Sequence, residues 1–282
     1  MDICGSPAGK LIPRDSNPGF VSLRPGGVGR NIAHDLCLMG LEVSLIAALG
    51  GDVYAAAILE SCAALNMDMS MARILPDYRS STYLYVTDES GDMEVGISDM
   101  EIVRNISPDY LKPLMGRINS AAAVVIDANL QPETITFIAE NCTAPLYADP
   151  VSTVKAERLR PILGRLFAIK PNLMEAEHLT GEKDAELAAR ALLRAGVKRV
   201  FISLGAQGIL AAEGEQMLRL PNVKAEVINT TGAGDAATAA LVWAGVHEMD
   251  LRESAMAALR AGALTTECME ANNPRLTEAF ER

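Results

Sequence analysis

The sequence predicts an α/β fold in which a mainly parallel sheet is covered by helices on both faces. Short apolar, β-branched runs alternate with longer segments of helical periodicity from about residue 40 onward, which is the order of parallel strands joined by crossover helices. The chain has 282 residues, of which 49% are hydrophobic, and this is enough apolar material for one large core. No internal repeat or low-complexity linker interrupts the pattern.

The expected elements follow from the spacing of apolar residues. A short continuous apolar run indicates a buried strand, and an apolar stripe at helical spacing indicates a helix. The expected strands are residues 43–48, 123–127, 146–148, 166–169, 199–203 and 225–228. The expected helices are residues 29–39, 54–65, 132–141, 175–180, 185–195, 235–247 and 251–264.

Residues 6–24 and 80–98 break this order. The first stretch is rich in Pro, Gly and polar residues, and the second alternates apolar and polar residues around a turn at 88–91, which is typical of a β-hairpin. A hairpin between strand–helix units fits poorly into a central sheet. We therefore expect both stretches to form a small β lid over one edge, where ligand sites of such sheets lie. Residues 1–5, 25–79 and 99–282 would form the main α/β domain.

Charge and composition exclude several classes of function. The net charge is −11 and no run of Lys or Arg occurs, so nucleic acid is not an expected partner. The five cysteines and three histidines are dispersed, as is typical of reduced thiols and of residues that bind no metal. No apolar run is long enough for a bilayer, and the N-terminus lacks a signal pattern. We therefore expect a cytoplasmic protein with no membrane partner.

The segment 229–235, which reads NTTGAGD, indicates phosphoryl-transfer chemistry. Gly232 and Gly234 allow close approach of the backbone to a ligand, and the helix that follows presents unpaired N–H groups. Such a turn would stabilise negative charge on a transferred phosphoryl group. Asp235, in the first helical turn, would accept the proton of an attacking hydroxyl.

Two other readings of this segment stay open. Asp235 would serve only as a helix cap if the glycines merely turned the chain. The segment also fits a relaxed dinucleotide fingerprint through Gly232, Gly234 and Ala237. That fingerprint needs an acidic residue after a second strand, and here the corresponding region reads as helix. The chain contains no P-loop sequence.

A second glycine cluster precedes the helix expected at residues 29–39. Gly26 and Gly27 come just before it, and Asn31 lies in its first turn, where an amide offers both a donor and an acceptor. This arrangement suits close contact with a hydroxyl-rich ligand. A purely structural turn is the alternative.

Together, the two segments resemble the two signatures of the ribokinase-like (pfkB) family of carbohydrate and nucleoside kinases. The first signature matches Gly26, Gly27 and Asn31, and the second, D-T-x-G-A-G-D, matches Thr230 and residues 232–235. The order, spacing and hairpin position also agree, so the resemblance covers nearly the whole chain. It implies a three-layer α/β/α kinase domain with a small β lid.

The resemblance implies a role for individual residues. Asp235 would be the catalytic base, and Gly232, Ala233 and Gly234 would supply the anion hole. Glu175 would help to hold Mg²⁺ through water, as part of an N-x-x-E motif that also fits a helix capping box. The residues implied to bind ATP are Asn172, Ser203, Gly205, Gly208, Thr230 and Asn272. Those implied to bind the sugar are Asp2, Asn17, Gly27 and Asn31, with Thr82 or Tyr83 of the lid and Lys155.

Within the family, the chain resembles the pseudouridine kinases more than other members. The stretches that carry this likeness are residues 15–19, 25–33, 98–100, 149–152 with Lys155, and 272–274. The implied reaction is transfer of the ATP γ-phosphate to the 5′-hydroxyl of pseudouridine. Two alternatives stay open: a related kinase acting on ribose, another nucleoside or a sugar acid, and a non-catalytic ligand-binding relative.

Two positions depart from the family pattern. Asn229 stands where the second signature begins with Asp. This neighbourhood contributes to a monovalent-cation site in the family, so the loss of the carboxylate weakens the expectation that the chain binds K⁺. Residues 2–5 resemble the tail of a motif that ends the family's first strand, so we expect that strand to be truncated. Lid hairpins of related enzymes often pair across a two-fold axis, which implies a homodimer through the lid.

Overall fold

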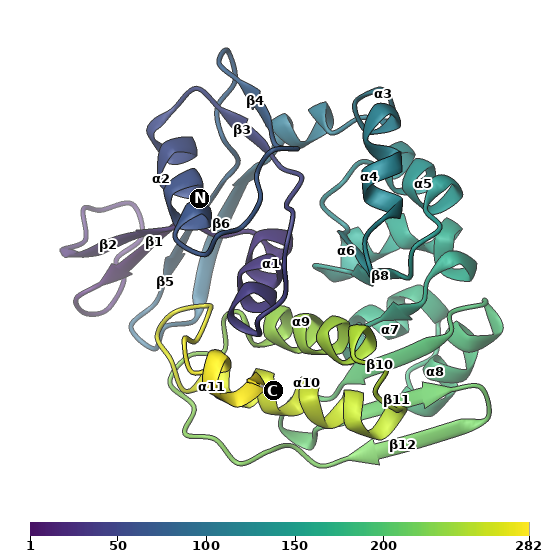
Figure 1. Cartoon of the computed structure of the whole chain (residues 1–282). Coiled ribbons are helices and arrows are strands. Elements are labelled where there is room, and N and C mark those ends of the chain that lie inside the picture. Colours follow the sequence, from purple (N-terminus) through teal and green to yellow (C-terminus); the bar gives the residue numbers. More distant parts are fainter. Residues whose placement is uncertain (282) are drawn as a thin grey trace. The chain divides into compact units, whose positions relative to one another are not determined.

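The computed structural model describes residues 1–281 and divides the chain into two compact units (Figure 1). Unit 1 comprises Met1–Gly27 and Ser44–Asn105, and unit 2 comprises Val28–Val43 together with the chain from Ile106 onward. Each unit has its own sheet.

The sheet of unit 2 confirms the expected α/β fold with a mainly parallel sheet. Its order is β12-β11-β10-β9-β8-β7, and neighbouring strands from β7 to β10 run parallel, while β11 is antiparallel to both of its neighbours. The strands are β7 (Val124–Asp127), β8 (Leu146–Asp149), β9 (Ala168–Ile169), β10 (Arg199–Ser203), β11 (Ile209–Glu213) and β12 (Gln216–Leu220).

Helices of unit 2 cover both faces of this sheet. Phe201 of β10 packs in a core cluster with Trp243 and Leu259, whereas its neighbours Val200 and Ile202 are buried on the other face, because side chains alternate along a strand. The helices are α1 (Val28–Leu38), α3 (Pro108–Leu111), α4 (Met115–Asn119), α5 (Pro132–Asn141), α6 (Thr153–Ala156), α7 (Leu173–Thr180), α8 (Ala185–Arg194), α9 (Ala233–Val246), α10 (Leu251–Thr266) and α11 (Leu276–Phe280), with short 3₁₀ turns at Lys112–Leu114, Glu157–Arg165 and Gly205–Gln207.

Small side chains let α9 pack closely in the centre of unit 2. Ala236, Ala239 and Ala240 are fully buried, and Gly245 lies against the ring of Tyr147 from β8. Helix α9 packs most extensively against α10, and it also packs against α1 (Figure 1). This packing holds the N-terminal end of α9 in a fixed place relative to α1 and the sheet.

Unit 1 is built on a four-stranded sheet with the order β2-β1-β5-β6. Strands β5 (Thr82–Thr87) and β6 (Met93–Asp99) pair antiparallel, which confirms the hairpin expected at residues 80–98. The remaining elements are β1 (Asp2–Pro7), β2 (Gly19–Arg24), β3 (Ala48–Gly50), α2 (Val53–Ala63), β4 (Arg73–Leu75) and a 3₁₀ turn at Glu101–Asn105. Residues 1–5, expected in the main domain, thus lie in the same sheet as the hairpin. The role of this sheet as a lid stays a prediction.

Two expected strands differ from the structure. The strand expected at 225–228 is wrong. The backbone N–H groups of Ile228 and Asn229 donate to Thr266 O (2.8 and 3.2 Å) at the end of α10, so this segment is bonded to the end of a helix and not to a neighbouring strand. Of the strand expected at 43–48, only Ala48 lies in β3. Strands β11 and β12 were not expected, because their mixed short runs carry little β signal. None of the helices within residues 1–281 is long and apolar enough to cross a membrane.

Candidate active site

Polar side chains gather where the parallel strands of unit 2 end. Asp127 is the last residue of β7, Asp149 is the last residue of β8, and Lys170 directly follows β9. The carboxyl ends of parallel strands are the usual place for ligand sites in such sheets. Asp127, Asp149 and Lys170 were given no role from the sequence. Their shared position after successive buried strands is the signal that would have identified them.

Segment 229–235 makes a tight turn into α9. Gly232 has φ = 82°, and a Cβ atom there would lie 2.0 Å from Ala271 O, so only glycine fits. The Ala233 N–H donates to Thr230 O at 3.3 Å, within the turn itself. Within residues 1–281 the N–H groups of Gly234 and Asp235 have no protein acceptor. The donors that remain open for an anion are therefore those of the first turn of α9.

Asp235 contacts the polar residue of the first signature. Asn31, on α1, donates from Nδ2 to Asp235 Oδ2 at 2.9 Å. Burial raises the pKa of Asp235 to about 7, with a further increase from the nearby Asp149 carboxylate, while the Asn31 hydrogen bond and Lys170 oppose the shift. A carboxylate whose pKa lies near neutral pH is suited to accept a proton from a hydroxyl.

Asp149 and Lys170 are fixed beside this carboxylate. Asp149 Oδ2 accepts from Thr238 Oγ1 of α9 at 2.7 Å and lies 3.9 Å from Lys170 Nζ. Both charged side chains are buried. Lys170 Nζ would be 3.6 Å from a Cβ atom on Gly234. A buried cation next to the open amides of α9 supplies positive potential where a phosphoryl group would carry negative charge.

The expected N-x-x-E motif forms a helix cap at the start of α7. Asn172 Oδ1 accepts from Glu175 N and Glu175 Oε2 accepts from Asn172 N, both at 2.8 Å, which confirms the capping box. Glu175 Oε1 has no protein donor within residues 1–281. Burial raises the pKa of Glu175, and the Asn172 hydrogen bond and Lys170 oppose that shift. The pair therefore caps the helix and leaves one carboxylate oxygen open.

The expected nucleotide turn adjoins this cap. Ser203, at the end of β10, forms a parallel bridge with Asn172 and donates its backbone N–H to Pro171 O at 2.9 Å. The next turn contains Gly205 and Gly208, with φ = 58° and 95°, and a Cβ atom on Gly208 would collide with Leu220 O. The glycines are thus required by the turn itself, and their contact with a nucleotide stays a prediction.

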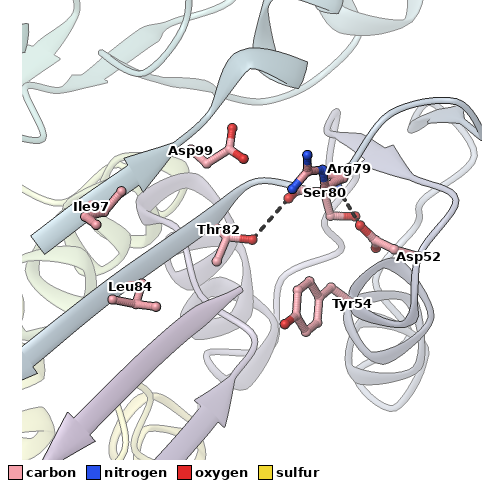
Figure 2. A pocket seen from close by; sticks show the side chains of 8 residues that line it. All are labelled: Asp52, Tyr54, Arg79, Ser80, Thr82, Leu84, Ile97 and Asp99. Carbon is pink, nitrogen blue, oxygen red and sulfur yellow. Dashed lines mark hydrogen bonds between the residues drawn. The ribbon is translucent and has the colours of Figure 1, made fainter. Parts of the chain in front are cut away.

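In unit 1 the structure separates two residues that were offered as alternatives. Asp2 pairs in register with Tyr83, so their side chains share one face of the sheet. Thr82 points to the opposite face, into a cavity of about 240 Å³ whose lining includes Asp99 and Arg79 (Figure 2). Of these two residues, Tyr83 is therefore the one on the same face as Asp2.

Gly26 and Gly27 meet different requirements next to Asp2. A Cβ atom on Gly26 would lie 2.0 Å from Asp2 Oδ2, so the backbone of Gly26 rests against this carboxylate. Gly27 has φ = 99° and open space around its Cα. Asn17 is occupied elsewhere: its amide bonds the backbone of Ile12 twice, as donor and as acceptor. Its contact with a substrate stays a prediction.

Two further predicted residues are engaged with protein groups of unit 2. Lys155 donates from Nζ to Asn129 Oδ1 at 2.6 Å, and burial lowers its pKa. Asn272 donates to the Asp35 carboxylate of α1 at 2.9 Å. The adenine contact expected for Asn272 is not tested by this geometry, but its side-chain amide is already bonded to α1.

Comparison with known proteins identifies relatives of this chain. Residues 10–278 match the pfkB family carbohydrate kinases. A pseudouridine kinase of Escherichia coli K12 is 34% identical over 287 residues, covering 99% of this chain and 91% of the relative. An uncharacterized sugar kinase of the same organism, YeiI, is 30% identical, covering 98% and 78%.

A solved structure shares the fold. The structure of Arabidopsis thaliana ribokinase complexed with ribose and ATP superposes with a TM-score of 0.86 at 19% identity, covering 99% of this chain and 95% of that one. At that identity the likeness shows the ribokinase-like fold alone. The family match and the E. coli relative go further, because they span nearly all of the chain. The chain therefore belongs to the pfkB family of carbohydrate kinases, which are phosphotransferases acting on an alcohol group.

Proposed function

We propose that this chain is an ATP-dependent pseudouridine kinase, which transfers the γ-phosphate to the 5′-hydroxyl of pseudouridine. The observation that carries the chemistry is the Asp235 carboxylate, with a pKa of about 7, at the start of α9 and bonded by Asn31. In this proposal Asp235 accepts the proton of the 5′-hydroxyl as that oxygen attacks the γ-phosphorus, and ADP leaves. The 34% identity to a pseudouridine kinase supports the substrate.

Unit 1 supports a nucleoside over a free sugar. Tyr83 and Tyr85 share a face with Asp2, and their rings stack with centroids 5.5 Å apart. In this proposal Asp2 binds ribose hydroxyls, and the exposed part of the tyrosine pair gives a base a surface on which to stack. A free pentose would leave that surface unused.

The nucleotide and metal would use the groups around Lys170 and α7. Lys170 and the open amides of Gly234 and Asp235 would hold phosphate oxygens. Within residues 1–281 no three His, Cys, Asp or Glu side chains are grouped as a metal site. The open Oε1 of Glu175 therefore suits Mg²⁺ that keeps water and phosphate ligands. Mg²⁺ would neutralise charge on the phosphates.

A coupled ADP-release assay tests the substrate. With ATP and Mg²⁺, we expect kcat/KM for pseudouridine to exceed that for uridine, adenosine and ribose by about tenfold or more, the scale on which binding sites discriminate between similar substrates. Tyr83→Ala should raise KM for pseudouridine by about tenfold, the scale of one lost base stack, while Tyr83→Phe should not. Turnover of ribose without turnover of pseudouridine would contradict the proposal.

We also propose that the sheet of unit 1 pairs with a second copy of the chain. Two rows of apolar residues cross one face of all four strands, Leu23–Ile3–Leu84–Ile97 and Val21–Gly5–Val86–Val95. Five of these side chains are exposed: Val21, Leu23, Leu84, Val95 and Ile97. A contiguous apolar face of this kind marks an interaction site, and a second copy offers an identical one.

Light scattering after size exclusion tests this pairing. The 30.0 kDa chain should elute as a dimer, and Ile97→Glu should convert it to a monomer, because a buried charge without a partner is costly at an interface. Ile74→Glu is the control, since Ile74 is also exposed but lies on β4, outside this sheet. A wild type that is monomeric at high micromolar concentration would refute the pairing.

A further inference from the structure

Asn272 joins the segment after α10 to the first turns of α1. Its side chain is buried, with 8% exposed. Nδ2 donates to Asn31 O at 3.1 Å and to Asp35 Oδ1 at 2.9 Å, and Oδ1 accepts from Arg30 Nη1 at 3.0 Å. Every polar atom of this amide is bonded to α1, so the side chain is held in one orientation.

The same arginine reaches the residue that bonds Asp235. Arg30 Nη1 also donates to Asn31 Oδ1 at 3.4 Å, and Asn31 Nδ2 donates to Asp235 Oδ2 at 2.9 Å. The two ends of an asparagine amide are alike in shape but opposite in hydrogen bonding. A cationic donor at Oδ1 therefore turns Nδ2 away from itself and towards Asp235.

We propose that Asn272, Arg30 and Asp35 form a positioning network that holds the Asn31 amide nitrogen on the Asp235 carboxylate. Asp35 anchors Asn272, Asn272 fixes Arg30, and Arg30 fixes Asn31. None of the three touches the reacting atoms in this arrangement, so their effect on proton transfer passes through Asn31. The consequence for activity rests on the proposed role of Asp235 as the base.

Asp35 completes the network as an uncharged acid. Its side chain is fully buried, and Oδ2 has no hydrogen-bond partner among residues 1–281. Burial raises the pKa of Asp35 to about 8; the Asn272 hydrogen bond and Arg30 oppose the shift, and the Asp235 carboxylate adds to it. A neutral carboxyl at pH 7 avoids an unpaired buried charge on α1 while its Oδ1 still accepts from Asn272.

The charged groups around Asp235 come from several elements. Asp149 and Asp127 raise its pKa from the strand ends, Lys170 lowers it, and Asp35 interacts with it from α1. Helix α10 faces this turn of α9 with Gly262, next to Ala233 O and the methyl group of Ala237. The Asn31 hydrogen bond is the only side-chain hydrogen bond that these described groups make to the carboxylate. Disturbing it should therefore change the proton affinity of Asp235 directly.

Asn272→Ala tests the network against a purely structural role, with Asn273→Ala as the matched control. Asn273 is the neighbouring buried amide, but its side chain donates to Leu264 O and accepts from Arg275 N, and neither of these residues lies on α1. Losing the aligned donor should raise the pKa of Asp235 by about one unit or more. The rising limb of kcat/KM against pH should move to higher pH by that amount for Asn272→Ala and stay in place for Asn273→Ala.

A second variant and a second measurement distinguish a failure of the network from a failure of the proposed function. Arg30→Lys keeps the charge but loses the planar fork, and it should shift the limb in the same direction. The Asp235 carboxyl carbon can be titrated by ¹³C NMR and assigned by its loss in Asp235→Asn. If the wild type phosphorylates none of the substrates, the proposed function fails while this titration still tests the network. An unchanged Asp235 titration in folded Asn272→Ala and Arg30→Lys would overturn the network.

Discussion

Asp235→Asn is expected to lower kcat by about 10²–10⁴-fold, the range that a positioned general base contributes. The amide keeps the size of the side chain but cannot accept the hydroxyl proton, so substrate binding should change far less than kcat. Steady-state assays with the best substrate measure both quantities. In the wild type, kcat/KM should rise with pH through about 7, because Asp235 is active only when ionised and its pKa lies there.

Asp250→Asn provides the matched control for this change. Asp250 is also an acidic residue at a helix N-terminus, where its Oδ1 accepts from Glu253 N and caps α10. The amide oxygen of Asn preserves this cap, so kcat should stay within about twofold of wild type. Equal activity of Asp235→Asn and wild type would show that Asp235 is not the base. Lost activity with retained nucleoside and ATP binding would support the base.

The regular elements of unit 2 were predictable because their local signals agree with their tertiary environment. The strand at 199–203 and the helix at 132–141 begin and end where the sequence placed them. The strand is a short continuous apolar run, the helix has apolar residues at helical spacing, and the helix begins at a proline, which favours a first helical position. The strand predicted at 225–228 was wrong for the opposite reason. Val227 and Ile228 are exposed, and the backbone N–H of Ile228 donates to the end of α10, which no local pattern reveals.

The candidate site was predictable only in part. The signatures identified Asp235 and Asn31, and the structure brings these side chains into contact. The partners of Asn272 lie more than 230 positions away along the chain, so its contact with α1 could not be read from neighbouring residues. Lys170 was given no role from the sequence. The case for a role in the site comes from the burial of its charge beside Asp149. That contact depends on the order of the strands in the sheet.

Asp35→Asn is expected to make the protein more stable at pH 8 than the wild type, by an amount of the order of a few kcal/mol. The pKa of Asp35 is raised from its ordinary value of 3.8 to about 8 in the folded chain. Between these values the folded state holds a proton that the unfolded state has released, so wild-type stability falls as pH rises through this window. Each pH unit is worth at most about 1.4 kcal/mol.

The substitution should remove this dependence without removing the contact. The introduced amide would still offer an oxygen to Asn272, and it is neutral at every pH, like the protonated acid. Urea unfolding at pH 4.5 and at pH 8 measures the gap between the two proteins, which should be about 1 kcal/mol at the lower pH and several times larger at the higher one. Other acids whose pKa is raised in the folded chain, such as Asp127, titrate in both proteins and largely cancel in the difference.

Asp184→Asn is the control for the same chemical change at an exposed helix cap, where Asp184 accepts from Glu186 N and Leu187 N at the start of α8. Its carboxylate is exposed, so this variant reports the effect of the same chemical change away from α1. A constant difference between Asp35→Asn and wild type across the range would mean that Asp35 is ionised in the folded chain. The unpartnered Oδ2 would then be a buried charge, and the network on α1 would need a different anchor.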